Sequence, residues 1–207
     1  MHILRKTAQR DAHLALCAAL VFAASIVCGA ARAQGMVPNT VEAQCASCHG
    51  PAGDSPSGKV PRLNGQNYAY LVQRLKGFRD ITRQSPHAAY VMWDVASTIA
   101  DKRIDALAAY YAAQPPTPPA PKAPLAQKGR DLFLHGAEGV PACQQCHGAE
   151  GAGAGATPRI AGQHAPYLNQ ALIDFSTQAR VSATMNHPAL RLSQSEIDEL
   201  VAYLAND

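Results

Sequence analysis

The chain has 207 residues, of which 47% are hydrophobic and 16% charged, with 15 glycines and 15 prolines, a composition that excludes a disordered tail or a fibrous repeat. A mean hydropathy of -0.13 excludes a protein that crosses a membrane many times. Four of the 18 basic residues but only one of the 15 acidic residues lie within residues 1–33, so the formal net charge of +3 belongs to that segment and gives no reason to expect a nucleic-acid partner.

Residues 1–33 have the pattern of a cleaved signal peptide. Three basic residues within the first ten precede an apolar run over residues 14–27, and small residues then lead to a cleavage site after Ala33. A retained membrane anchor is the alternative interpretation of the same run. Cleavage predicts a working protein of residues 34–207 that is exported to the periplasm, and it removes two of the six cysteines.

A proline-rich segment divides the exported part of the chain. Six of the ten residues 115–124 are prolines, and such a run favours extended polyproline II structure rather than a place in a packed core. The sequence therefore predicts a first domain over residues 34–114, a linker over residues 115–124 and a second domain over residues 125–207.

The two predicted domains repeat one another in three blocks. The first block holds a Cys-x-x-Cys-His motif and recurs 98 residues later, the second recurs 97 residues later and the third 93 residues later. The recurring residues include Cys45, Cys48 and His49 with Cys143, Cys146 and His147; Pro61, Arg62, Gln66, Tyr70 and Arg83 with Pro158, Arg159, Gln163, Tyr167 and Arg180; and Met92 and Ile104 with Met185 and Ile197. Matches in the same order across three blocks indicate an internal duplication.

Each domain is predicted to be helical. Apolar residues at i, i+4 and i+7 over residues 71–78 and 168–175 form two amphipathic stripes. Ser193 and Glu196 predict a capping box ahead of a further stripe near the C-terminus, and Asp101 is expected to cap the corresponding helix of the first domain. No segment alternates well enough to predict a strand, and glycine-rich and proline-rich loops are expected after each motif. The predicted fold class is all-α.

The Cys-x-x-Cys-His motif is the attachment signature of c-type haem. Two thiols three positions apart reach the two vinyl groups on one edge of a porphyrin, and the adjacent imidazole then lies under the iron. Two such motifs, each inside a repeat and behind a signal peptide, predict two covalently bound haem c groups. The cysteines expected to form thioethers are Cys45, Cys48, Cys143 and Cys146, and the expected proximal iron ligands are His49 and His147.

Other uses of paired cysteines compete with haem attachment. Zinc ribbons separate their two pairs by roughly 15 to 20 residues, whereas 94 residues lie between Cys48 and Cys143. A redox-active pair or plain disulfides are compatible with an oxidising compartment. Neither explains why a histidine follows both pairs.

The sixth ligand of each iron decides between electron transfer and catalysis, because a second protein ligand closes the iron to substrate while a vacant position admits peroxide or oxygen. Met92 and Met185 stand at matching places in the repeat, in loop-like sequence before the last helix. A methionine on a helix is more often core filler, but the paired placement predicts that these two are the distal ligands. His87 and His187 are competing candidates, although they do not share a repeat position.

These features together resemble the di-haem class I cytochromes c, and specifically the cytochrome c4 family. The resemblance covers residues 34–207 and rests on the haem motifs, on the Pro-Arg-Leu-Asn-Gly-Gln block at 61–66, on Met92 and on the block at 104–110, with their counterparts in the second domain. It implies two tandem helical haem domains related by a pseudo-twofold axis, His/Met ligation, and soluble or membrane-associated electron transfer toward a terminal oxidase. In the second domain, residues around 129–133 resemble the N-terminal helix that crosses the last helix in this fold, whereas the short approach to the first motif leaves an equivalent helix open.

Two further repeated pairs are candidates for contacts with haem. Arg62 and Arg159 offer guanidinium groups to haem propionates, or else they are solvated loop residues. Tyr70 and Tyr167 either contact the porphyrin edge or its propionates, or they pack against the last helix.

The function predicted on this basis is that of an electron carrier rather than an enzyme. Its expected partners are redox proteins, with a quinol-oxidising complex or a dehydrogenase as donor and a terminal oxidase as acceptor, and peripheral association with the membrane is left open. The alternatives are a haem c subunit of a periplasmic dehydrogenase and, against the paired methionines, a di-haem peroxidase. Residues 34–114 hold eight basic and six acidic residues and residues 125–207 five and eight, so one hypothesis is that the two ends dock different partners.

Overall fold

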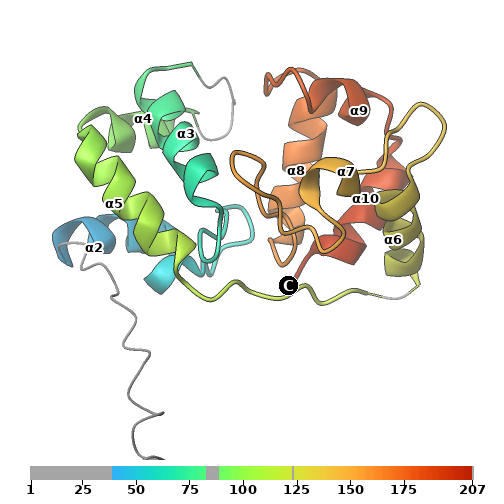
Figure 1. The fold of residues 1–207 in the computed structure, drawn as a ribbon, viewed down its shortest axis with the longest axis horizontal. Helices are drawn as coiled ribbons and strands as arrows, with labels where there is room; N and C mark the ends of the chain where they lie inside the picture. The colour runs from blue at the N-terminus through green and yellow to red at the C-terminus, as the bar shows by residue number, and fades with distance from the viewer. Residues whose placement is uncertain (1–38, 83–88, 123, 207) are drawn as a thin grey trace, which may run out of the picture. The chain divides into compact units, whose positions relative to one another are not determined.

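The fold is given by a computed structural model that describes residues 39–82, 89–122 and 124–206. The predicted signal peptide and His87 lie outside these ranges. In chain order the elements are α2 (Asn39–His49), η1 (Pro51–Gly53), α3 (Tyr68–Arg79), α4 (Ala89–Ser97), α5 (Asp101–Ala112), α6 (Leu125–His135), α7 (Gln144–His147), α8 (Ala165–Ser176), α9 (Asn186–Leu190) and α10 (Gln194–Leu204) (Figure 1). Within the described ranges the chain has isolated backbone bridges but no strand, as predicted, and none of its helices has the length and apolarity needed to span a membrane.

The two predicted apolar stripes form helices. α3 buries Leu71 and Phe78, and α8 buries Leu168 and Phe175 at the corresponding places. Each pair is seven residues apart, so both side chains of a pair lie on one face of their helix and point into the core.

The capping box at the start of α10 is confirmed. The Ser193 hydroxyl accepts a hydrogen bond from the backbone N–H of Glu196 at 3.3 Å, and the Glu196 carboxylate accepts one from the backbone N–H of Ser193 at 2.7 Å. The Ser193 hydroxyl also donates to the Glu196 carboxylate at 2.6 Å, and the two bonds that this carboxylate accepts, first that from the hydroxyl, hold the pKa of Glu196 below its usual value. Two backbone donors that the helix leaves unpaired are thereby satisfied.

The predicted cap of α5 is wrong. Ala100 occupies the N-cap position and supplies no side-chain bond, while Asp101 is the first residue of the helix. The Asp101 carboxylate instead accepts a hydrogen bond from the guanidinium of Arg79 at the end of α3, which lowers the pKa of Asp101, and it lies 3.5 Å from the ammonium of Lys76. A contact between two helices has taken the place of the local cap.

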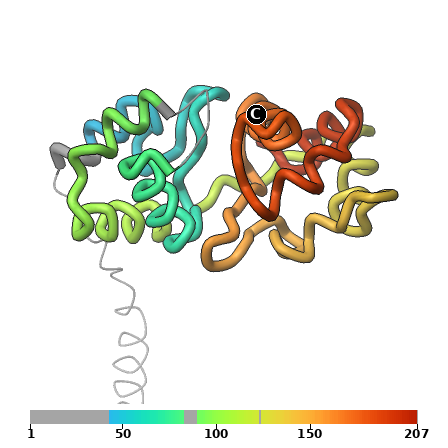
Figure 2. Tube along the Cα trace, turned by 90° about the horizontal axis from the view of Figure 1, so that it is seen from above, coloured from blue at the N-terminus to red at the C-terminus, as the bar shows by residue number. Residues whose placement is uncertain are grey.

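The core consists of two separate clusters of buried apolar residues, one in each half of the chain. The first is formed by Leu71, Ile99, Ile104, Leu107, Ala108 and Tyr111, and the second by Leu132, Phe133, Val140, Leu168, Ile197, Leu200, Val201, Leu204 and Ala205. The trace in Figure 2 separates the two halves, with blue to green in one and yellow to red in the other.

The expected helix at the start of the second half is present as α6, and it packs across α10 (Figure 1). Gly129 lies at the crossing, where an added Cβ would overlap the backbone carbonyl of Glu199. Only glycine permits so close an approach of the two backbones. In the first half the approach to the motif is itself helical, because α2 begins at Asn39 and runs into the motif without a break.

Residues 115–122 connect the halves without helix or strand, as an extended segment visible below both halves in Figure 1. Its backbone is paired with the end of α10: the N–H of Ala120 donates to Ala205 O at 2.8 Å, and that of Lys122 donates to Ala202 O at 3.1 Å. The proline-rich connection is therefore fixed along the second half.

Candidate haem sites

The first Cys-x-x-Cys-His motif lies in the last turns of α2. Cys45, Cys48 and His49 stand at positions i, i+3 and i+4 of the helix, so they share one face. Gly50, with a φ of 76°, ends the helix directly after the histidine. Cys45 is half-buried against the first core cluster, while Cys48 is exposed.

The second motif is built on a shorter helix, but its two cysteines are half-buried and exposed in the same order. α7 is a single turn that starts after Cys143 and ends at His147, followed by Gly148 with a φ of 73°. Cys143 is half-buried against the second core cluster and Cys146 is exposed. Each motif therefore places its first cysteine inward and its second outward.

Both motif histidines are oriented in the same way by a proline carbonyl. His49 Nδ1 lies 2.9 Å from Pro61 O, and His147 Nδ1 lies 3.0 Å from Pro158 O. Because a carbonyl oxygen only accepts, Nδ1 carries the proton in each ring, and the lone pair of Nε2 is available to a metal. The two prolines recur 97 residues apart in the sequence, and this repeat is the signal from which the contact could have been predicted.

Burial shifts the pKa values of titratable groups in both motifs. It lowers the pKa of His49 and of His147 below the ordinary value, although the hydrogen bonds to the prolines act in the opposite direction. Burial also raises the pKa of the Cys143 thiol. The imidazoles are thus neutral near pH 7, which is the form that binds a metal.

A cavity of about 580 Å³ opens beside the first motif, and Cys45, Cys48, His49 and Met92 all line it. Its volume falls within the range of cofactor and ligand sites, about 300–1,000 Å³. Much of the remaining wall is apolar and includes Leu71, Leu75, Phe78, Val95, Ile99 and Leu107. An apolar cavity with two thiols, an imidazole and a thioether fits a covalently attached haem.

The two predicted distal methionines occupy different local structures. Met92 lies within α4 rather than in a loop, so the expectation of a loop at this position is wrong. Met185 lies in a turn directly before α9, where its backbone N–H donates to the Ser182 hydroxyl at 3.2 Å. Both side chains are half-buried, whereas the competing His187 is exposed on α9.

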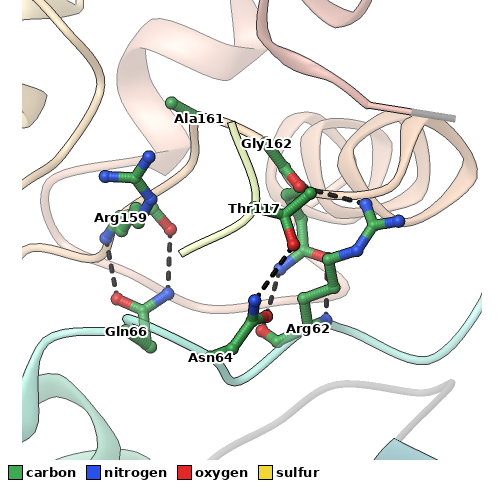
Figure 3. Close-up of a pocket in the computed structure, with 8 residues that line it drawn as sticks. Arg62, Asn64, Gln66, Thr117, Arg159, Ala161 and Gly162 are labelled. Carbon is green, nitrogen blue, oxygen red and sulfur yellow. Dashed lines mark hydrogen bonds between the residues drawn. The ribbon is translucent and has the colours of Figure 1, made fainter. Parts of the chain in front are cut away.

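Two repeated glutamines join the halves in a reciprocal way. Gln66 Nε2 donates to Arg159 O at 2.8 Å and its Oε1 accepts from Arg159 N at 2.7 Å, as the dashed lines in Figure 3 mark. Gln163 makes the same two bonds with the backbone of Arg62, at 3.1 and 2.8 Å. Gln66 and Gln163 occupy matching places in the repeat, and so do Arg62 and Arg159. Each glutamine thus binds the arginine of the other half, as a pseudo-twofold relation requires.

Arg62 is not a solvated loop residue. Its guanidinium donates to Asp54 Oδ1 at 2.9 Å and to two backbone carbonyls of the second half, Gly162 O at 3.0 Å and Asn206 O at 2.7 Å. Its side chain is only 14% exposed. The sequence presented these residues as repeats but did not reveal that the two copies bind one another.

Comparison with known proteins agrees with this geometry. The family described as Cytochrome c matches residues 126–206, and the family described as Cytochrome C oxidase, cbb3-type, subunit III matches residues 37–110. Cytochrome c4 of Thiocapsa roseopersicina is 38% identical over 169 residues, which cover 77% of this chain and 85% of that protein. The solved structure of Acidithiobacillus ferrooxidans cytochrome c4 superposes with a TM-score of 0.74 at 37% identity, covering 78% of this chain and 98% of the other. The thiosulfate dehydrogenase electron acceptor of Stutzerimonas stutzeri strain A1501 is 33% identical over 178 residues, which cover 81% of each chain.

Two cytochrome c domains, each with its attachment motif, define a di-haem c-type cytochrome. The protein therefore carries two covalently bound haem c groups, and the zinc and disulfide interpretations of its cysteines are excluded. At this identity and coverage the chain belongs to the cytochrome c4 family. It is an electron carrier that exchanges electrons with redox proteins, and it is not an enzyme.

Proposed function

We propose that each half binds one haem through its own motif and closes the iron with its own methionine. Cys45 and Cys48 form the thioethers of the first haem, His49 Nε2 is the proximal ligand and Met92 sulfur the distal one. In the second half, the same roles fall to Cys143, Cys146, His147 and Met185. The observation that carries this assignment is the shared cavity, which brings the four residues of the first set together from α2 and α4.

Bound haem supplies a one-electron couple between ferric and ferrous iron. The residues of the chain determine how that couple behaves: the proline carbonyls hold the two imidazoles in place, and the methionine sulfurs favour the ferrous form and raise the reduction potential. A histidine and a methionine held at each iron would leave no position there for a reactant, so that only an electron would enter or leave.

The proposed setting of this chemistry is the periplasm. Residues 1–33 act as the export signal, and the haem domains comprise residues 34–114 and 125–207 with the linker of residues 115–124 between them. This division is supported by the separate core clusters of the two halves and by the ranges of the two family matches.

The proposed route of electrons runs from a donor, either a quinol-oxidising complex or a dehydrogenase, to a terminal oxidase. A dehydrogenase donor is supported by the thiosulfate dehydrogenase electron acceptor among the relatives. That relative also supports a second candidate, in which the protein is the dedicated haem subunit of one dehydrogenase rather than a carrier shared by several enzymes. Purification from the native membrane and periplasmic fractions distinguishes the two, because a dedicated subunit elutes with its enzyme.

Two reactions of the holoprotein test the carrier function. Under anaerobic conditions, thiosulfate dehydrogenase and its substrate are expected to reduce both haems, and membranes that contain a terminal oxidase are expected to reoxidise them. Hydrogen peroxide is expected to leave the reduced haems largely untouched. Multiple turnover of peroxide by the purified protein would overturn the proposal in favour of a di-haem peroxidase.

A further inference from the structure

A buried arginine of the second half lies in the wall of the first half's cavity. Arg180 follows α8 and is only 7% exposed. Its backbone is held at both polar groups: its N–H donates to Asp174 O at 2.8 Å, and its carbonyl accepts from Asn186 Nδ2 at 2.7 Å. The position of this residue is therefore fixed within its own half.

The side chain of Arg180 faces the other half. It lines the same cavity as Cys45, His49 and Met92. Its Nη2 donates to the hydroxyl of Tyr70, which belongs to α3 of the first half, at 3.3 Å, and its Cζ lies 4.4 Å from the ring centre of Phe175. A cation from one repeat thus reaches the cofactor cavity of the other.

This guanidinium lacks a full set of partners. Its Nε is buried without a hydrogen bond, and no carboxylate in residues 39–82, 89–122 or 124–206 forms an ion pair with it. An arginine remains charged under all ordinary conditions, and a buried charge is costly unless it is paired. The unpaired donor therefore points to an anion that belongs in the cavity.

The cofactor of this cavity carries such anions, because haem has two propionate side chains. We propose that Arg180 binds a propionate of the haem held by Cys45 and Cys48, so that the second half sets the reduction potential of the first half's haem. The proposal rests on the haem assignment given above. A guanidinium binds a carboxylate through two parallel N–H donors, which explains the otherwise unused Nε.

The expected effect on the potential has a definite sign. Without Arg180 the propionate is an uncompensated negative charge close to the iron, and such a charge favours the ferric over the ferrous state. Loss of the guanidinium therefore lowers the potential of the first haem. The second haem, attached at Cys143 and Cys146, is expected to respond much less.

The test is a redox titration of the holoprotein in which the two haems are resolved by NMR, with the haem methyl signals assigned through their contacts to residues of each half. In Arg180→Gln, the ratio of reduced to oxidised first haem at a fixed potential is expected to fall about tenfold, which corresponds to about 59 mV for one electron. Arg180→Lys keeps the charge but not the paired donors, so a smaller drop is expected. Arg191→Gln removes an exposed arginine of the same half and is the matched control, with no change expected.

Equal shifts of both haems, or an unchanged first haem in the folded Arg180→Gln variant, would overturn the proposal. A shift confined to Arg74→Gln, which removes the other arginine of the cavity wall, would overturn it too. If Arg180→Gln fails to accumulate, Arg180→Met decides, because its unbranched apolar side chain still packs on Phe175. Each of these failures leaves the methionine-to-iron absorption band intact, whereas failure of the ligand assignment removes that band from the wild type.

Discussion

The reciprocal glutamine contacts between the halves yield a quantitative prediction. Gln66 is only 7% exposed, and its side chain makes two hydrogen bonds with the backbone of Arg159 in the other half. A typical protein hydrogen bond contributes about 0.5–1.5 kcal/mol net, so removal of both is expected to cost about 1–3 kcal/mol. Gln66→Ala is expected to lower the free energy of unfolding by that amount, and Gln163→Ala by a similar amount, since it removes the equivalent pair.

The assay is urea denaturation of the holoprotein, followed in parallel by far-UV circular dichroism and by haem absorbance. Gln73→Ala is the matched control, because Gln73 is an exposed glutamine on α3 whose side chain accepts a hydrogen bond from its neighbour Arg74. The double variant Gln66→Ala/Gln163→Ala is expected to cost less than the sum of the two single changes. Once one pair is lost the halves separate more easily, and the other pair contributes less.

A loss of less than about 0.5 kcal/mol for Gln66→Ala, the low end for a single hydrogen bond, would refute this reasoning. It would mean that the halves are held together by other contacts, or that water replaces the glutamine without penalty. Full additivity in the double variant would show that the two pairs act independently.

Three further predictions concern single elements. Phe133→Ala removes a side chain with 0% exposure and is expected to destabilise the second half by about 3–5 kcal/mol in chemical denaturation, and a loss below 1 kcal/mol would contradict its place in the core. Gly129→Ala forces apart the crossing of α6 and α10 and is expected to cost about 1–3 kcal/mol, measured as a lower urea midpoint; an unchanged midpoint would mean that the helices separate freely. Because the pKa of Glu196 is lower in the folded protein, its stabilising contribution is present above the usual value of 4.5 and is lost as the pH falls through the folded pKa. The stability difference between wild type and Glu196→Gln is therefore expected to shrink on acidification, and a difference that grows would contradict the capping box.

Local patterns predicted the features that depend on short stretches of chain. The helices α3 and α8 follow from apolar spacing, the capping box from two residues three apart, and the haem motifs from five consecutive residues. One of the two wrong predictions involves a residue whose partner lies elsewhere in the chain, and the other a helix that the sequence reasoning missed. Asp101 was expected to cap its own helix, but the cation of Arg79 competes for the carboxylate across the helix packing. Met92 was expected in a loop, yet the apolar residues around it form α4.

The contacts between the halves were the least accessible to prediction. Gln66 and Arg159 lie 93 residues apart, and nothing in either local sequence indicates that they touch. The repeat was the available signal, because residues that recur in both domains without an apolar role are candidates for a shared interface or a shared cofactor. Arg180 belongs to the same class, and the burial of its Nε without a hydrogen bond became visible only in the structure.

The central claim is that both irons are closed by a methionine, and it is tested most directly by the near-infrared absorption band of sulfur bound to ferric haem. The oxidised wild type is expected to show this band with the intensity of two methionine-ligated haems per chain and to resist the binding of cyanide. Met92→Ala and Met185→Ala are each expected to lose half of its intensity and to bind one cyanide. Rapid binding of cyanide by the wild type, or a variant that keeps the full band, would contradict the account.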